Sequence, residues 1–348
     1  MGEYFSGQRN YAEERYRLSS VPLYITELVP APVRGKCVTF FQLFLAFGIV
    51  LAYLVDLAFT PSGNWRAMFA VVIIPAIILM IAVFWLPESP RWLILKKRPE
   101  KAFEALLQTR NQEVATQEIK AIYQALEKEV QISWRELLLS RQFLMPLMIA
   151  VLVAIFNQMT GINSFLQYAP QILKSTGFSS DLTAMLGSLG IGVLNFICTL
   201  IAMLLVDTVG RKPLLIFGTA GIVLAEVYLA IINQIGLPPH MQGVLSLIGL
   251  FCFIISYALG PGVVVWLVIS ELFPTRFRGR GISICLFFNS LASTILASVF
   301  LVLKDAIGFG GTYWICAGFS FFYMLTAIFL VPETKSRTLE EIQHSFDR

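Results

Sequence analysis

Charged side chains are scarce in this sequence: 14% of residues are Asp, Glu, Lys or Arg, against 57% hydrophobic residues. This balance excludes an ordinary water-soluble globule and is typical of a protein with several membrane spans. The net charge is only +4, and the basic residues lie in loops between apolar runs, so the chain lacks the basic face of a nucleic-acid-binding protein. We therefore expect an integral membrane protein that binds the lipid bilayer and no nucleic acid.

The residues that most often carry catalysis or bind metals are also few. The only two histidines, His240 and His344, have no serine or carboxylate arrangement near them that is typical of a catalytic triad. The five cysteines form neither a CxxC pair nor a Cys/His ligand set. We predict no enzyme activity, no metal site and no cofactor. Four cysteines lie inside apolar runs, where we expect buried positions: Cys198, Cys252, Cys285 and Cys316.

What the sequence has in abundance is long apolar runs. Eight of them are long enough to cross a bilayer as a helix, which takes about 20 residues. We therefore predict an all-α, polytopic membrane protein. Most lysines and arginines fall in alternate loops, which places those loops and the C-terminus in the cytoplasm and favours the plasma membrane. The predicted spans cover residues 38–59, 67–86, 143–172, 183–206, 213–235, 243–269, 281–303 and 312–331.

Two polar segments flank the first spans. Residues 1–20 contain no apolar core of a signal peptide and form a polar leader. In residues 87–142, Pro99 suits the first position of a helix, and apolar residues follow it at helical spacing. We expect two or three amphipathic helices on the inner membrane face; a solvated linker is the alternative. The apolar positions are Phe103, Leu106, Leu107, Ile119, Ile122 and Leu126.

The sequence contains an internal repeat. ELVPAPVRGK at residues 27–36 matches ELFPTRFRGR at residues 271–280, and each copy is followed by two spans and a Pro-Glu pair. Membrane carriers are often built from duplicated halves. Four spans precede the second copy but almost none precedes the first, so we expect an N-terminally truncated carrier. Its predicted parts are a residual N-terminal half-bundle at 21–86, a cytoplasmic helical segment at 87–142, a six-span C-terminal half-bundle at 143–331 and a cytoplasmic tail at 332–348.

Several ordered motifs together resemble the sugar-porter family of the major facilitator superfamily, which includes facilitative glucose transporters and proton-linked xylose symporters. The resemblance implies a bundle of twelve spans, of which about eight are present. It also implies transport of a monosaccharide, a hexose or pentose, by alternating access, with or without proton coupling. A remnant without transport activity and a non-transporting sugar sensor are the alternatives. The motifs are VPLYITELVPAPVRG, PESPRWL, QMTGIN, VDTVGRKPL, GPG with Trp266 and SELFP, and PETKSRTLEEI.

One predicted span carries an unusual number of amides around Gly161. Such groups are costly in lipid and should face the protein interior or a wet cavity, where they can donate to and accept from sugar hydroxyls. Gly161 and Pro170 allow this helix to bend. Hydrogen bonding between helices is the alternative role. The resemblance places sugar contacts at Gln42, Asn157, Gln158, Asn163, Asn195, Trp266 and Asn289, while Asn157, Gln167 and Ser290 depart from residues that are usual in some relatives.

Charged residues gather at the predicted cytoplasmic ends of the spans. Opposite charges there can pair when the inner side closes and separate when it opens, and in the resembled family such pairs favour the outward-facing state. Simple anchoring at the membrane surface is the alternative. The predicted gating charges are Glu27, Arg34, Arg91, Asp207, Arg211, Lys212, Glu271, Arg278 and Glu333.

Glu226 lies deep inside a predicted span. An acid within a membrane is a functional candidate by default. The favoured interpretation is nevertheless a side chain that reaches toward the outer interface, because the resemblance implies that this helix is peripheral.

Overall fold

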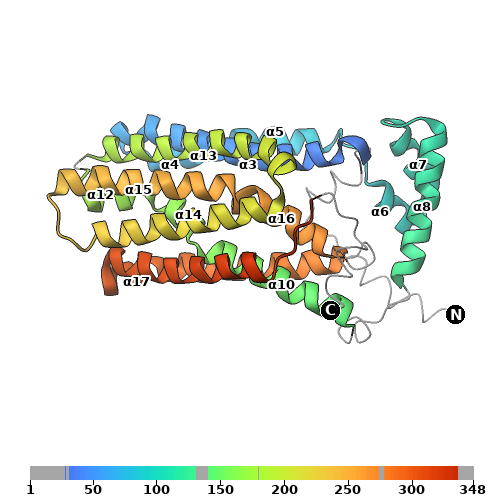
Figure 1. The fold of residues 1–348 in the computed structure, drawn as a ribbon. Coiled ribbons are helices and arrows are strands. Elements are labelled where there is room, and N and C mark those ends of the chain that lie inside the picture. Colours follow the sequence, from blue (N-terminus) through green and yellow to red (C-terminus); the bar gives the residue numbers. More distant parts are fainter. Residues whose placement is uncertain (1–27, 29–30, 131–139, 179, 274–277, 336–348) are drawn as a thin grey trace. The chain divides into compact units, whose positions relative to one another are not determined.

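The computed structural model describes residues 28, 31–130, 140–178, 180–273 and 278–335, and every regular element in these ranges is a helix. The predicted all-α fold is confirmed. In chain order the elements are α3 (Ala31–Phe59), η1 (Thr60–Ser62), α4 (Trp65–Val71), α5 (Ile73–Val83), α6 (Pro90–Leu95), α7 (Pro99–Leu107), α8 (Gln112–Val130), α10 (Arg141–Met159), α11 (Ile162–Gln167), α12 (Ala169–Thr176), α13 (Asp181–Val209), α14 (Arg211–Ile232), α15 (Pro239–Leu259), α16 (Pro261–Leu272) and α17 (Arg278–Phe329) (Figure 1).

Among the described residues, seven helical segments are long and apolar enough to cross a membrane. The last of them, α17, has 52 residues and contains Gly308 in a non-helical conformation, with φ of 72°. This length is more than twice that of one span, so α17 is two spanning arms joined at Gly308. Counted this way, the helices account for all eight predicted spans.

The chain divides into two compact units. Unit 1 consists of Met1–Gln42 and Ile74–Trp134, and unit 2 consists of Leu43–Ile73 and Arg135–Arg348. The predicted division into half-bundles stays a prediction.

The core of unit 2 is aromatic. Phe165 of α11 makes edge-on contacts with three other rings, and the ring centroids lie 4.8 Å from Phe253, 5.3 Å from Tyr313 and 5.8 Å from Phe300. These rings come from α15 and from both arms of α17, so one short helix ties several spans together. Such pairs contribute about 0.5–1.5 kcal/mol each beyond the area they bury. The long helices of this unit run side by side in Figure 1.

Two spans of unit 2 are interrupted, and one of the interruptions lies at Gly161, where the sequence predicts a bend. Helix α10 ends before Gly161, which has φ of 81°, a left-handed conformation that favours glycine, and α11 begins directly after it. Helix α15 ends at Gly260, and Pro261 opens α16. The helix is therefore interrupted at Gly161, as predicted, and each of the two breaks divides a long span into two helical segments.

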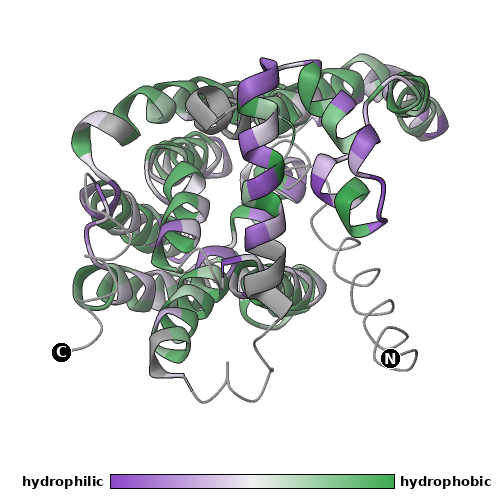
Figure 2. Cartoon of the chain, turned by 90° about the vertical axis from the view of Figure 1, so that its right-hand side faces the viewer, coloured by the Kyte–Doolittle hydropathy of each residue, from purple (hydrophilic) through white to green (hydrophobic). Residues whose placement is uncertain are grey.

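Unit 1 contains the amphipathic helices. Pro99 opens α7 as predicted, and a small buried cluster of Leu93, Ile94, Ala102 and Ala105 joins α6 to α7, with Ile119 and Ile122 of α8 packed against it. Among the apolar positions of α7, Leu106 is buried and Leu107 is exposed, whereas the side chain of Leu126 lies outside the described part of the chain. In Figure 2, hydrophilic residues are interleaved with hydrophobic ones along α7 and α8.

The connection between α7 and α8 is fixed by one arginine. The guanidinium of Arg110 forms an ion pair with Glu118, and its side chain is almost fully buried. It also donates a hydrogen bond of 2.9 Å to the carbonyl oxygen of Leu28. Arg110 therefore links the amphipathic helices to the residues just before α3.

Two expectations about side-chain direction inside the spans are wrong. Cys198, Cys285 and Cys316 are buried as predicted, but Cys252 is exposed on α15. Glu226 does not reach toward the outer interface, because its side chain is 0% exposed. It lies on the face of α14 that also buries Ile222 and Leu229. In spans that are apolar on all sides, the sequence pattern carries little information on which face is buried.

Gly218 of α14 lies so close to the start of α16 that adding one methyl group there should have a large effect. A Cβ atom added at Gly218 of α14 would lie 2.6 Å from the Cα of Gly260 and 2.7 Å from the Cδ of Pro261. We therefore expect Gly218→Ala to destabilise the protein by about 1–3 kcal/mol through overpacking. Gly318→Ala is the matched control, because a Cβ there meets nothing within 4 Å. Thermal unfolding in detergent measures both; equal melting temperatures would contradict the prediction.

Candidate functional site

The amide side chains predicted to contact a ligand form a hydrogen-bonded network in unit 2. Gln158 lies in the last turn of α10, and its Nε2 donates to Oδ1 of Asn289 on α17 at 3.1 Å. Asn163 lies on α11, beyond the break at Gly161, and its Nδ2 donates to Oε1 of Gln158 at 2.7 Å. Three predicted site residues from three helices are thus brought together, with Gln158 at the centre.

A residue that the sequence interpretation missed completes this network. Nδ2 of Asn163 also lies 3.0 Å from Oγ of Ser293, to which it donates. Ser293 comes four residues after Asn289 on the same helix, so both side chains lie on one face. That spacing is the signal that could have identified it. Asn163 is exposed while Gln158 is nearly buried, so the network extends from the interior of unit 2 to its surface.

The other predicted contact residues lie on the surrounding helices. Asn157 is 2% exposed, and its Oδ1 has no hydrogen-bond partner among the described residues. Asn195 of α13 is nearly buried, and Trp266 of α16 is partly exposed. Gln42 belongs to unit 1 and is partly exposed on α3. Among the described residues, no hydrogen bond joins Asn195 or Trp266 to the Gln158 network.

A separate cavity of about 440 Å³ lies in unit 2 near the end of α3. Its lining includes acidic, basic and amide groups, among them the ion pair of Lys174 with Asp181. One departure noted from the sequence, Gln167, contributes to this wall rather than to the Gln158 network. The other polar lining residues are Asp56, Thr60 and Gln171.

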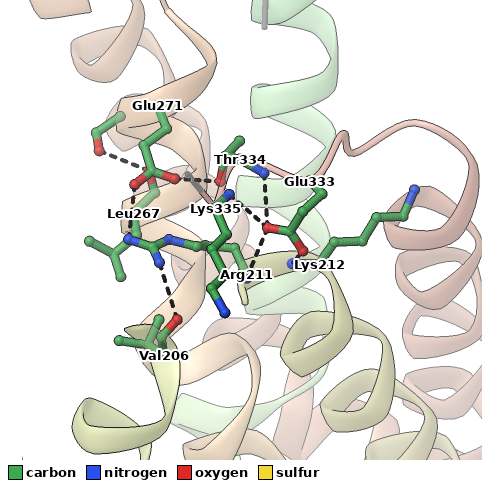
Figure 3. A network of polar contacts seen from close by, with 9 residues as sticks. Val206, Arg211, Lys212, Leu267, Glu271, Glu333, Thr334 and Lys335 are labelled. Carbon is green, nitrogen blue, oxygen red and sulfur yellow. Dashed lines mark hydrogen bonds and ion pairs between the residues drawn. The ribbon is translucent and has the colours of Figure 1, made fainter. Parts of the chain in front are cut away.

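Several predicted gating charges meet at the other end of unit 2 (Figure 3). Nη2 of Arg211, at the start of α14, lies 3.4 Å from Oε1 of Glu271 at the end of α16. The second oxygen of Glu271 accepts a hydrogen bond from the hydroxyl of Thr334. Arg211 also donates to the carbonyl oxygen of Val206 on α13 at 3.1 Å. This network connects α13, α14, α16 and the segment that follows α17.

Glu333 is the anion that holds the start of α14. Its carboxylate accepts the backbone N–H groups of Arg211 at 3.2 Å and Lys212 at 3.1 Å, the first residues of the helix. It also accepts those of Thr334 at 2.9 Å and Lys335 at 2.8 Å. Unpaired N–H groups and the helix dipole favour an anion at this place.

Position 210, next to the carboxylate of Glu333, requires glycine. Gly210 has φ of 109°, and a Cβ atom there would lie 3.0 Å from Oε2 of Glu333. Thr334 and Lys335 were not predicted as members of the network, although they directly follow the predicted Glu333. The Nζ of Lys335 donates to the carbonyl oxygen of Thr208.

The remaining predicted charges are placed differently. Arg278 begins α17, and its Nε is buried without a hydrogen-bond partner among the described residues, within electrostatic reach of Glu271. Arg91 lies in the first turn of α6 in unit 1. Glu27 and the side chains of Arg34 and Asp207 lie outside the part of the chain that the structure describes.

Comparison with known proteins identifies relatives that match nearly the whole chain. The profile of the family described as "Sugar (and other) transporter" matches residues 18–346. The chain is 34% identical to the galactose-proton symporter of Escherichia coli K12 over 327 residues, which cover 94% of this chain and 70% of the relative. It is 36% identical to the arabinose-proton symporter of the same strain over 328 residues, covering 93% of this chain and 69% of the relative.

Solved structures give the same result. The proton:xylose symporter XylE bound to 6-bromo-6-deoxy-D-glucose matches with a TM-score of 0.75 and 32% identity, over 93% of this chain and 70% of that chain. A partially occluded, inward-open conformation of XylE from E. coli matches with a TM-score of 0.77 and 31% identity, over 91% of this chain and 68% of that one. The similarity therefore extends over nearly all of this chain and about 70% of these relatives.

Proposed function

Because this chain belongs to the Sugar (and other) transporter family, we propose that it moves a monosaccharide across a membrane by alternating access. The family is one of transporters and not a class of enzymes. The spanning helices make the chain an integral membrane protein. The plasma membrane as its location and a cytoplasmic C-terminus belong to this proposal.

The observation that carries the proposal is the network of Gln158, Asn163 and Asn289. Amides both donate and accept hydrogen bonds, so they match the hydroxyl groups of a sugar, each of which does the same. The network joins α10, α11 and α17 across the break at Gly161. A sugar that replaces these mutual hydrogen bonds with its own would draw the short α11 toward or away from α10, which is the type of movement that alternating access requires.

The substrate class follows from the relatives. Those compared above are named as symporters of galactose, arabinose and xylose with protons. We therefore assign this chain a hexose or pentose substrate and proton symport. The sugar-contacting residues of this proposal remain those of the resemblance, Gln42, Asn157, Gln158, Asn163, Asn195, Trp266 and Asn289, with Ser293 added by its hydrogen bond to Asn163.

The charge network of unit 2 is the inner gate in this proposal. Arg211, Glu271 and Glu333 join the helix ends that must separate when the cytoplasmic side opens. Interfacial ion pairs differ by only about a few kcal/mol between states, which suits a gate that must open and close readily. Glu27, Arg34, Arg91, Asp207, Lys212 and Arg278 complete the proposed set of gating charges.

Uptake into proteoliposomes tests the function. Purified protein is reconstituted, and the entry of labelled D-galactose, L-arabinose, D-xylose and D-glucose is measured with and without an inward proton gradient. We expect saturable uptake of at least one sugar that the gradient accelerates. Absence of saturable uptake for all four sugars would overturn the proposal and support a remnant without activity or a sugar sensor. Saturable uptake that ignores the gradient would overturn proton symport alone.

Asn163→Ala tests the proposed sugar contact on α11, directly after the break at Gly161. Asn163 donates to both Gln158 and Ser293 from α11, and a hydrogen bond contributes about 1 kcal/mol net. We expect KM for uptake to rise about 5- to 10-fold while the amount of protein in the membrane stays the same. Gln117→Ala removes an exposed amide from α8 and is the matched control. Unchanged kinetics of Asn163→Ala would exclude a ligand contact at this residue.

A further inference from the structure

Glu226 is a carboxylic acid in the middle of α14 with no role in the networks described so far. Its side chain is 0% exposed, and neither carboxylate oxygen has a hydrogen-bond partner among the described residues. The exposed residues of the same helix, Phe217, Leu224 and Ile231, lie on another face. The acid therefore points into the interior of unit 2 and away from lipid.

The groups around Glu226 are polar but uncharged. Tyr313, Cys316 and Ser320 of the second arm of α17 lie near its carboxyl group, and the hydroxyl groups of Tyr313 and Ser320 also have no hydrogen-bond partner among the described residues. On the helices that pack against α14, the other groups able to ionise inside the spans are Cys198 on α13, Cys252 and Tyr257 on α15, Cys285 and Tyr323 on α17, and Tyr228 on α14 itself.

No cation is placed to neutralise the acid. Within the described parts of α13 to α17, the basic residues lie at the ends of the helices: Arg211, Lys212, Arg278, Arg280 and Lys304. Arg211 and Lys212 begin the same helix as Glu226 and are therefore about 21 Å away along its axis. An isolated carboxylate in an apolar interior is so costly that the group takes up a proton.

The same cluster touches the break that carries the amide network. The Sγ of Cys316 lies 3.4 Å from the place that a Cβ atom on Gly161 would occupy. The ring of Tyr313 contacts Phe165 of α11 with a centroid distance of 5.3 Å. Residues 313–320 of α17 thus contact the α10–α11 break on one side and Glu226 on the other. A displacement of α11 must change the packing, and with it the access of water, around the acid.

We propose that Glu226 is a proton-binding residue of unit 2 that is coupled to sugar binding through α17 and the break at Gly161. This inference rests on the proposed sugar transport. The carboxylate takes one proton from water and becomes a neutral acid in the closed arrangement, and it returns the proton to water when the α10–α11 break moves. Proton occupancy of Glu226 and sugar occupancy of the amide network then influence each other reciprocally.

Infrared difference spectroscopy of the reconstituted full chain tests the proton site directly. The carbonyl stretch of a protonated carboxylic acid is recorded from about pH 5 to about pH 10, with and without D-xylose or D-galactose. We expect a band that is absent in Glu226→Gln and disappears at high pH, at a midpoint that sugar shifts. A band that persists in Glu226→Gln, or one that does not titrate in this range, would overturn the proton site. A titrating band that neither sugar shifts would overturn the coupling.

The pH dependence of the Kd for sugar is the second measurement that tests the coupling. Calorimetry with the same sugars should show that the Kd of the unaltered chain changes at least about 5-fold across this pH range, as expected for coupled sites, whereas that of Glu226→Gln stays constant. Asp305→Asn removes an exposed acid near the end of the first arm of α17 and is the matched control. If neither sugar binds the unaltered chain at any pH, the proposed function fails, while the titrating band alone still decides whether Glu226 binds a proton.

A second variant covers the case in which Glu226→Gln does not fold. Ser320→Ala retains the acid and removes the hydroxyl group beside it. We expect the midpoint of the carboxyl band to shift by a measurable amount in this variant. An unchanged midpoint would overturn the assignment of the band to Glu226.

Discussion

Glu333→Ala should lower the free energy of unfolding by about 2–3 kcal/mol. The carboxylate of Glu333 accepts four backbone N–H groups, two of them at the start of α14. Hydrogen bonds to a charged group contribute about 1.5–3 kcal/mol each when buried, but water replaces part of the loss because the residue is only partly buried. Thermal unfolding in detergent should therefore shift by several degrees.

Two controls separate the hydrogen bonds of Glu333 from its charge. Glu333→Gln keeps one oxygen that can accept from the N–H groups of Arg211 or Lys212 but loses the negative charge, so we expect about half of the destabilisation. Asp305→Asn removes an exposed charge at the surface, where isolated ion pairs contribute little. If Glu333→Ala melts at the temperature of the unaltered chain, Glu333 does not fix the start of α14.

Much of the fold could be predicted because membrane spans follow from length and apolarity alone. The apolar runs located every span, and Gly161 and Pro99 mark helix boundaries that the structure confirms. Which face of each helix is buried in the protein was not predictable in the same way. Cys252 is exposed and Glu226 is buried because a helix that is apolar on all sides presents no polar stripe that identifies its outer face.

The part of the candidate site that lies in recognisable sequence motifs could be predicted. Gln158, Asn163 and Asn289 were expected from the resemblance, and the structure joins them by hydrogen bonds. Ser293 and Thr334 were missed because serine and threonine are frequent in spans and loops, and their roles depend on one neighbour that is distant in sequence. The four-residue spacing between Asn289 and Ser293 indicates a shared helix face, but the hydrogen bond from Asn163 to Ser293 becomes visible only when the helices are placed side by side.

Gln158→Ala should lower kcat/KM for sugar uptake by about 100-fold, the largest effect expected for a single side chain in this protein. Gln158 donates to Asn289 and accepts from Asn163, so its loss frees two amides on two other helices. Two hydrogen bonds at about 1 kcal/mol each, together with the cost of leaving the partly buried amide of Asn289 unpaired, amount to about 2.7 kcal/mol, which corresponds to that factor. Uptake of the sugar transported by the unaltered protein measures it.

A comparison with Gln158→Glu distinguishes a ligand contact from a structural role. Glutamate has nearly the same size and can still accept from Asn163, but an ionised carboxylate cannot donate to Asn289. If sugar hydroxyls need Gln158 as a donor, Gln158→Glu loses nearly as much uptake as Gln158→Ala while it melts at a temperature close to that of the unaltered chain. If Gln158 only holds α10 to α17, uptake falls in proportion to the loss of stability in both variants. Because Gln158 joins the helices on both sides of the Gly161 break, this comparison tests the step that links sugar binding to helix movement.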